Sequence, residues 1–295
     1  MSDQAHSLRQ MASLHEKGRP PKRSSQAKIV TVSSGKGGVG KSNFTLNFAL
    51  ALQSLGKRVL VFDADIGMAN IDVLMGSSSR YNLAHVLKRE KTMAEIVQSG
   101  AGSLPYIPGG SGISELFSLS DQDLEYFAEQ VEELAAEMDY VFFDTGAGLS
   151  KENLKFITSA DECLVITTPE PTSITDAYAL IKVVNGVQKE TAFKIIVNRA
   201  DNDNEALQVA DKISLVAHRF LGLNIPLLGY IRDDQHVTQS VKKQVPFSLA
   251  YPGCPASKDI LRLAHRFALM PVTAETGTLA GIKGFMQKWL RRPSK

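Results

Sequence analysis

A glycine-rich octet, residues 35–42 (GKGGVGKS), constrains the fold of this chain more than any other stretch. It matches the phosphate-binding pattern G-x-x-x-x-G-K-[ST] between an apolar run at 28–34 and a helix-like apolar spacing at 43–55. A strand, a glycine loop and a helix N-terminus together bind a polyphosphate, because successive backbone N–H groups turn toward it. We expect Lys41 to contact the terminal phosphates and Ser42 to contact Mg²⁺. The residues expected to bind nucleotide here are Gly35, Lys36, Gly37, Gly38, Val39, Gly40, Lys41, Ser42 and Asn43.

Apolar, β-rich runs alternate with helical patterns along the chain. Their apolar character is continuous, which is typical of parallel strands covered on both faces, with helices as crossovers. The runs are 28–34, 58–63, 104–107, 140–144, 163–168, 194–198 and 226–231. The pattern predicts an α/β fold with a doubly wound, mostly parallel sheet of seven or eight strands flanked by helices.

Composition limits the class of protein. The 295 residues are 43% hydrophobic and 22% charged, enough for one α/β domain with extensions. The two cysteines, Cys163 and Cys254, lie far apart without a CxxC pair, which favours a reducing compartment and argues against a zinc or iron–sulfur site. No uncharged run approaches the ~18 residues of a spanning helix, so a cytoplasmic protein is expected.

The net charge of +2 conceals an asymmetry between the ends and the middle of the chain. Residues 1–28 hold six Lys/Arg against two acidic residues, and residues 276–295 hold five against none. The rest has a net charge of −7. Basic ends on an acidic core indicate interactions made by the ends.

Three aspartates fall at predicted strand ends, where ligands collect in a parallel sheet. Asp63 and Asp65 end the run VFDAD, and Asp144 ends VFFD. Phosphoryl transfer needs oxygen ligands for Mg²⁺ and a group that orients the attacking water, which carboxylates supply. The alternative for any one of them is helix capping or turn formation.

The additional lysine in the octet, Lys36, adds a specific resemblance. The octet resembles the deviant P-loop of the MinD/ParA class of ATPases, and the alternative is a lone surface lysine. The resemblance implies Mg²⁺-dependent ATP hydrolysis to ADP and an ATP-dependent homodimer in which Lys36 reaches the partner's nucleotide. It gives catalytic roles to Lys36, Lys41 and Asp65, with Asp65 positioning the water.

The same resemblance implies further assignments in two segments. In DADIGMANID, Asp63 supports the metal shell and Asn70 matches a switch residue, while in DTGAGL, Asp144 holds Mg²⁺ through water. The metal set is therefore Ser42, Asp63 and Asp144. At the base, Asn198 of KIIVNR is implied to hydrogen-bond adenine, with Arg199 beside it.

A second base loop is implied by IPLLGYIRDD, with Asp233 near the base. It carries Arg232 where the family commonly has proline. The stretch NRAD at 198–201 is one residue away from the guanine motif NKxD. Because the resemblance implies that Asn198 binds adenine, it favours ATP over GTP despite this near-match.

Residues 279–292 (LAGIKGFMQKWLRR) form an amphipathic basic pattern with the chain's one tryptophan. Such a helix is suited to an anionic membrane, and the alternative is a helix packed on the domain. The two can also alternate: the helix would be packed on the domain in the monomer and released to the membrane on dimerisation. The residues expected to enter the membrane are Leu279, Ile282, Phe285, Met286, Trp289 and Leu290.

Near the N-terminus, residues 3–9 (DQAHSLR) resemble the DQAxxLR element of the FlhG family, the MinD-like regulators of flagellar number and placement. That resemblance implies that Asp3, Gln4, Leu8 and Arg9 activate the signal-recognition-type GTPase FlhF. It also implies flagellar basal-body and C-ring proteins and anionic lipids as partners, on the inner face of the membrane. The expected division is a partner-activating element at 1–27, the ATPase domain at 28–275 and the membrane helix at 276–295.

Other functions stay open at this stage. A ParA-type DNA-partitioning ATPase would use basic residues for phosphate contacts, but the apolar half of the tail makes DNA an unlikely partner. A MinD-type division-site regulator has the same core. An iron–sulfur carrier would need clustered cysteines, and a scaffold would bind nucleotide without turnover.

Overall fold

The structure is a computed structural model that describes residues 27–65, 70–110, 120–270 and 281–290. The element predicted at Asp3, Gln4, Leu8 and Arg9 lies outside these ranges, and so does Leu279.

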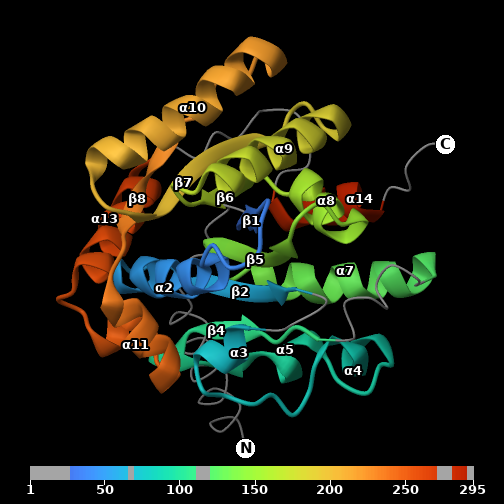
Figure 1. Cartoon of the computed structure of the whole chain (residues 1–295). Coiled ribbons are helices and arrows are strands. Elements are labelled where there is room, and N and C mark those ends of the chain that lie inside the picture. Colours follow the sequence, from blue (N-terminus) through green and yellow to red (C-terminus); the bar gives the residue numbers. More distant parts are fainter. Residues whose placement is uncertain (1–26, 66–69, 111–119, 271–280, 291–295) are drawn as a thin grey trace, which may run out of the picture.

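One eight-stranded sheet forms the centre of the molecule, in the order β3-β4-β2-β5-β1-β6-β7-β8 (Figure 1). All neighbouring strands pair in parallel except β3, which runs antiparallel to β4 at one edge. The strands are β1 (Lys28–Ser34), β2 (Val59–Ala64), β3 (Gln98–Ser99), β4 (Pro105–Ile107), β5 (Tyr140–Ala147), β6 (Glu162–Thr167), β7 (Ala192–Ala200) and β8 (Leu227–Arg232). The predicted fold class is confirmed.

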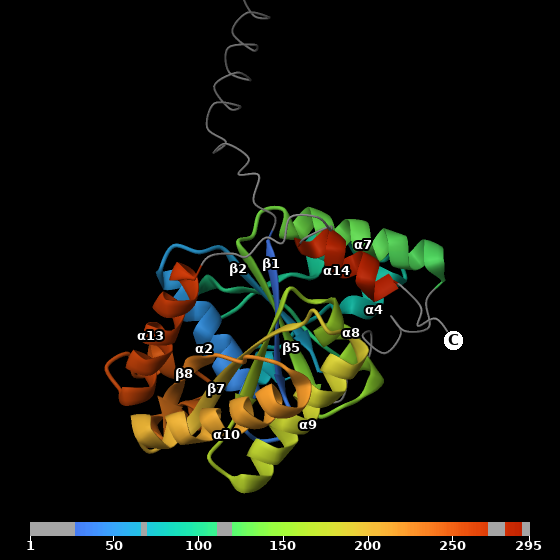
Figure 2. The same cartoon turned by 90° about the horizontal axis from the view of Figure 1, so that it is seen from above.

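Helices cover both faces of this sheet (Figures 1 and 2). The longer ones are α2 (Lys41–Ser54), α7 (Asp121–Ala135), α8 (Lys151–Ser159), α9 (Pro171–Val187), α10 (Asp203–Leu221), α11 (Gln235–Lys243), α13 (Pro255–Leu269) and α14 (Gly281–Leu290). Short helices are α3 (Ile71–Leu74), α4 (Leu83–Leu87), α5 (Met93–Ile96) and α12 (Phe247–Ala250), with a 3₁₀ turn at Ala101–Ser103.

Strict alternation along the strands divides the core between the two faces. Val30, Val61 and Phe142 pack toward α2 and α13, whereas Leu60 and Phe143 pack toward α7, α8 and α14. A third cluster joins α9 and α10 to β6 and β7. The runs of the central strands β1, β2, β5 and β6 are continuous because these strands bury both of their faces.

The P-loop follows β1 at the carboxyl edge of the sheet, where α2 begins. The helix starts at Lys41, two residues before the predicted start, so the last residues of the octet already belong to its first turn. The strand boundaries agree with the predicted runs to within two residues, apart from β5, which continues to Ala147. The edge strand β3 was not predicted, because two residues carry no periodic signal.

Candidate nucleotide site

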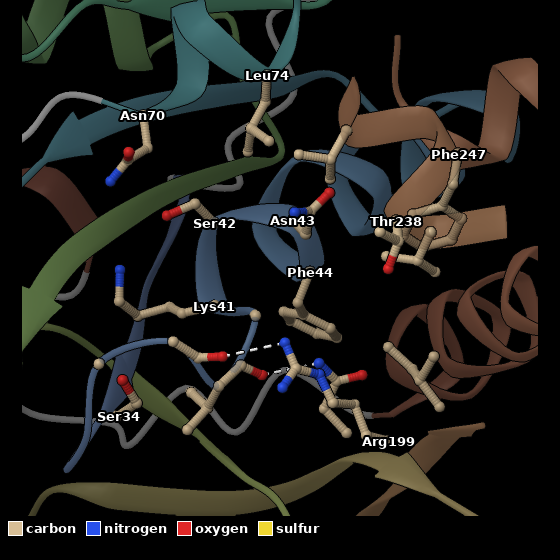
Figure 3. A pocket seen from close by; sticks show the side chains of 18 of the residues that line it. Ser34, Lys41, Ser42, Asn43, Phe44, Asn70, Leu74, Arg199, Thr238 and Phe247 are labelled. Carbon is tan, nitrogen blue, oxygen red and sulfur yellow. Dashed lines mark hydrogen bonds between the residues drawn. The ribbon is translucent and has the colours of Figure 1, made fainter. Parts of the chain in front are cut away.

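A pocket of about 880 Å³ opens beside the P-loop. Its walls come from the P-loop and the start of α2, the loop after β2, the end of β7, and the segment from β8 through α11 to Phe247 (Figure 3). The pocket therefore lies at the carboxyl ends of the parallel strands, where an α/β sheet binds its ligands.

Two glycines of the loop are required by its geometry. Gly40 has φ of 89°, a left-handed conformation that strains other residues, and a Cβ there would collide with the side-chain amide of Asn198. A Cβ on Gly35 would collide with the backbone of Asp176 in α9. The loop thus packs against β7 and α9 too closely for any side chain at these two positions.

The predicted base-binding pair, Asn198 and Arg199, contacts the loop itself. The Asn198 amide donates to the carbonyl of Val39 at 2.8 Å, and the Arg199 guanidinium donates to that of Gly38 at 3.1 Å (Figure 3). Arg199 has φ of 57°, which is uncommon outside glycine. Both side chains also line the pocket, so the structure links the proposed base end to the P-loop backbone.

Lys41 and Asp144 form a buried ion pair beneath the loop. The ammonium lies 3.1 Å from Asp144 Oδ1, and these side chains are 7% and 0% exposed. The hydroxyl of Thr45, one turn further along α2, donates to the same oxygen at 3.0 Å. Within the described part of the chain, Asp144 Oδ2 is buried without a hydrogen-bond partner. An unsatisfied carboxylate oxygen is costly in apolar surroundings, so it fits a position that receives a metal-bound water.

Asp63 has a different environment. Its two oxygens accept backbone N–H groups from Asp65, Asn70 and Ile71 at 2.9–3.2 Å. Burial and, after it, the charge of Asp144 raise the pKa of Asp63, the three N–H groups oppose both effects, and the net pKa is about 7. In this structure Asp63 binds the backbone at Asp65 and at the start of α3, which corresponds to the capping alternative noted for a lone aspartate. Its role in the metal shell stays a prediction.

Lys36 extends away from the buried pair. Its ammonium donates to Glu170 at 2.9 Å and to Thr172 at 3.0 Å, at the start of α9, and the side chain is 40% exposed. Lys36 and Lys41 thus occupy different places, one at the rim and one beneath the loop. Neither Glu170 nor Thr172 was predicted, because an exposed pair at a helix start has no sequence signature.

The remaining predicted residues gather around the pocket. Ser42, Asn43, Asp65, Asn70 and Asp233 all line it, and Figure 3 shows the polar ends of Ser42 and Asn70 on the same side as Lys41. The structure therefore brings the P-loop and the residues predicted for the switch and for base binding together in one pocket.

The backbone after Asp144 is held by a residue that sequence reasoning missed. Asn153 is 3% exposed, and its amide donates to the carbonyls of Gly146, Ala147 and Gly148 at 3.0–3.3 Å. It lies on α8, so that helix fixes the loop DTGAG. An asparagine within an ordinary amphipathic helix pattern does not indicate this role.

Arg232, at the position where proline was expected, joins the pocket wall to α13. Its guanidinium makes two 2.8 Å hydrogen bonds to the fully buried carboxylate of Asp259, and its backbone N–H donates to the same group. The segment after β8 is thereby fixed without proline.

The C-terminal helix α14 is docked on the domain (Figure 2). Its apolar side chains, Ile282, Phe285, Met286 and Trp289, are each at most 7% exposed and belong to the core cluster beside α7 and α8. Phe285 stacks on Phe143 with ring centroids 4.8 Å apart. Leu290 ends the helix. Docking was one of the two states expected for this segment.

No helix within the described ranges combines the length and apolar character that crossing a bilayer requires.

The fold and the glycine loop with its two lysines, Lys36 and Lys41, define a P-loop nucleotide-binding protein of the MinD/ParA type. Residues 30–247 match the family model "CobQ/CobB/MinD/ParA nucleotide binding domain". The chain is 32% identical to the antiactivator FleN of Pseudomonas aeruginosa over 97% of its own length and 98% of that protein. It is 34% identical to the flagellum site-determining protein YlxH of Helicobacter pylori, over 90% of each chain.

Solved structures agree with these relatives. The MinC:MinD cell division complex of Aquifex aeolicus matches with a TM-score of 0.67 and 26% identity, over 84% of this chain and 99% of that chain. The chain belongs to the CobQ/CobB/MinD/ParA nucleotide-binding family and, within it, to the group that contains FleN and YlxH.

Proposed function

We propose that this protein is an ATP-hydrolysing switch that dimerises with ATP and regulates flagellar number or placement. The observation that carries the proposal is the two-lysine P-loop, in which buried Lys41 faces Asp144 while Lys36 stands at the exposed rim. The relatives whose printed names are "Antiactivator FleN" and "Flagellum site-determining protein YlxH" supply the flagellar part.

Within one subunit, the residues have separable roles. Lys41 and the loop N–H groups would bind the terminal phosphates, and Asn198 would turn its amide from Val39 to adenine, beside Arg199 and Asp233. Mg²⁺, held by Ser42 and by Asp144 through water with support from Asp63, would neutralise phosphate charge. Asp65 would orient the attacking water at the pocket wall.

The position of Lys36 supports the dimerisation part of the proposal. Its contacts with Glu170 and Thr172 hold an exposed ammonium at the rim, and such a pair contributes little stability. Lys36 can therefore exchange its contacts with Glu170 and Thr172 for the phosphates of a partner's nucleotide at little cost in free energy. Charge from a second subunit would then stabilise the transition state, so hydrolysis would depend on the dimer.

The membrane part of the proposal rests on α14. Removing its four buried apolar side chains from the core into water costs roughly 1.5–3 kcal/mol each. A bilayer restores most of this burial, so release is favourable only where anionic lipid receives the helix. The protein would thus be cytoplasmic and reversibly peripheral on the inner membrane face, and pairing of two helices would raise avidity.

The N-terminal element, outside the described residues, would bring FlhF into this cycle, and flagellar basal-body proteins would be recruited in the ATP state. We expect Gln4→Ala to remove stimulation of the FlhF GTPase while leaving this protein's own ATPase unchanged. Stimulation that persists in the variant refutes this role.

The test of the proposed function is co-flotation with anionic liposomes in ATP and in ADP, with competing DNA. We expect ATP-dependent flotation that survives DNA, and its loss on deletion of residues 279–295 with dimerisation retained. Lys36→Ala should abolish both the ATP dimer, followed by light scattering, and hydrolysis. Salt-sensitive DNA binding without flotation would instead support the partitioning function, and unchanged hydrolysis in Asp65→Ala would refute the role of Asp65.

A further inference from the structure

A cluster of three different metal-binding side chains lies behind the base end of the pocket. Asp234, His236 and Cys254 each offer one ligand atom, and these atoms all lie within 4.8 Å of one another. The first two flank the start of α11, and Cys254 is the N-cap of α13. Cysteine spacing alone argued against zinc, but the fold brings this cysteine beside a histidine and a carboxylate from another segment.

The carboxylate of this cluster is fixed in place by backbone hydrogen bonds. Asp234 Oδ1 accepts the backbone N–H of His236 at 3.0 Å, and Oδ2 accepts that of Ala256 at 3.1 Å.

The other two groups face this carboxylate. His236 Nδ1 lies 2.7 Å from Asp234 Oδ1, and the imidazole is 35% exposed, which leaves an open side for entry of an ion. Cys254 is buried, and its sulfur accepts the N–H of Ser257 at 3.4 Å in the first turn of α13. A backbone donor at a helix N-terminus stabilises negative charge on sulfur.

We propose that Asp234, His236 and Cys254 form a binding site for a zinc-class divalent cation, with water as the fourth ligand. Thiolate, imidazole and carboxylate together select Zn²⁺ over Mg²⁺, which prefers oxygen ligands alone. Zinc binds sulfur at about 2.3 Å and nitrogen or oxygen at about 2.0–2.2 Å, so ligand atoms around one ion lie roughly 3.2–3.8 Å apart. The three ligand atoms, within 4.8 Å of one another, would have to adjust to this spacing, and the 35% exposed imidazole has room to move.

The position of the site gives the ion a structural effect. It would join the first turn of α11 to that of α13, next to Asp233 and Asp234, which both line the nucleotide pocket. Binding would release to solvent the proton between His236 and Asp234 and the thiol proton of Cys254, and the ion would strengthen a link that the metal-free chain makes with a hydrogen bond.

The experiment uses the untagged full chain, stripped of metal and titrated with Co²⁺ in excess Mg²⁺ and ADP. We expect one equivalent to produce a thiolate-to-cobalt charge-transfer band that Zn²⁺ abolishes. The band identifies sulfur, which the oxygen-lined Mg²⁺ site lacks. Zn²⁺ should also raise the melting temperature of the wild-type protein.

The variants separate ligation from folding. Cys254→Ser keeps a favourable N-cap and should lose the band, and His236→Gln should weaken Co²⁺ binding on the order of 10–100-fold or more. Cys163→Ala and His218→Gln, a buried cysteine of β6 and an exposed histidine of α10, should match the wild type. Absence of the band in the wild-type protein, its persistence in Cys254→Ser, or equal losses in the controls would overturn the proposal.

Discussion

Strand β5 separates two chemically opposite regions at consecutive residues. Asp144 faces α2, where Lys41 and Thr45 donate to its carboxylate and one oxygen is left for a ligand. Phe143 faces the other side, where Phe285 of α14 stacks on its ring. Because successive side chains point to opposite faces of a strand, any movement of the β5 backbone at Asp144 also moves Phe143 on the other face. The nucleotide site and the docked helix are thus neighbours through the sheet, although they lie on opposite faces of it.

The largest effect is expected on the Asp144 side. Lys41→Ala should reduce hydrolysis by at least ~100-fold, because it removes a positive charge from the phosphate site. It also leaves Asp144 buried without its countercharge, which should lower the free energy of unfolding of the nucleotide-free protein by roughly 3–5 kcal/mol. Phosphate release and urea unfolding measure the two effects. The double variant Lys41→Ala/Asp144→Asn should regain most of the stability and none of the activity; a double variant no more stable than Lys41→Ala would show that the pair is not the cause.

On the Phe143 side, Trp289→Ala should destabilise the protein by about 3 kcal/mol. The indole is 1% exposed and packs on Phe156, so its removal leaves a cavity in the core. Lys288→Ala, at the exposed neighbouring position, should change the free energy of unfolding by less than about 0.5 kcal/mol. Urea unfolding followed by circular dichroism compares the two. Equal stability of both variants would mean that α14 is not docked in solution.

The helix α8 lies between these regions and offers a sharper test. Asn153 of α8 holds the loop after Asp144, and Phe156, one turn later, lies 5.7 Å from the Trp289 ring between centroids. Asn153→Ala should cost about 1 kcal/mol and increase hydrogen exchange at residues 146–148, since three backbone carbonyls lose their side-chain donor. Thr158→Ala, which removes a hydroxyl bonded within the same helix, is the matched control. Unchanged exchange in Asn153→Ala would contradict the role of α8 in holding this loop.

The fourth test concerns pH. Burial raises the pKa of Asp63 to about 7, whereas the unfolded carboxyl titrates near 3.8. Between these values the folded chain retains a proton that the unfolded chain has lost. Stability should therefore fall as pH rises through this window and level off above about pH 7. Asp63→Asn should flatten that slope relative to the wild type in urea midpoints taken without nucleotide. An identical slope in the variant would show that other groups cause the pH dependence.

The sequence allowed prediction of those elements that carry a periodic apolar pattern or a motif with fixed residue spacing. The central strands among the seven predicted were visible because both of their faces are buried, and the octet located Lys41 and Ser42. The contacts that organise the site were not visible, because they join residues remote in sequence. Asn153, which donates to the loop at 146–148, and Arg232, which donates to Asp259, are single polar residues within ordinary helix and strand patterns. Likewise, an amphipathic pattern shows that α14 has an apolar face but not whether lipid or protein covers it.

The place of α14 in the chain has a consequence for synthesis. This helix closes the core beside α7 and α8, yet it is made after every other element that the structure describes. Translation proceeds at roughly 5–20 residues per second, so that flank of the nascent chain stays uncovered while the P-loop side is already packing. The rings of Phe143 and Phe156 then lack the cover of Phe285 and Trp289, and are open to chaperones and to self-association, until the tail emerges from the ribosome.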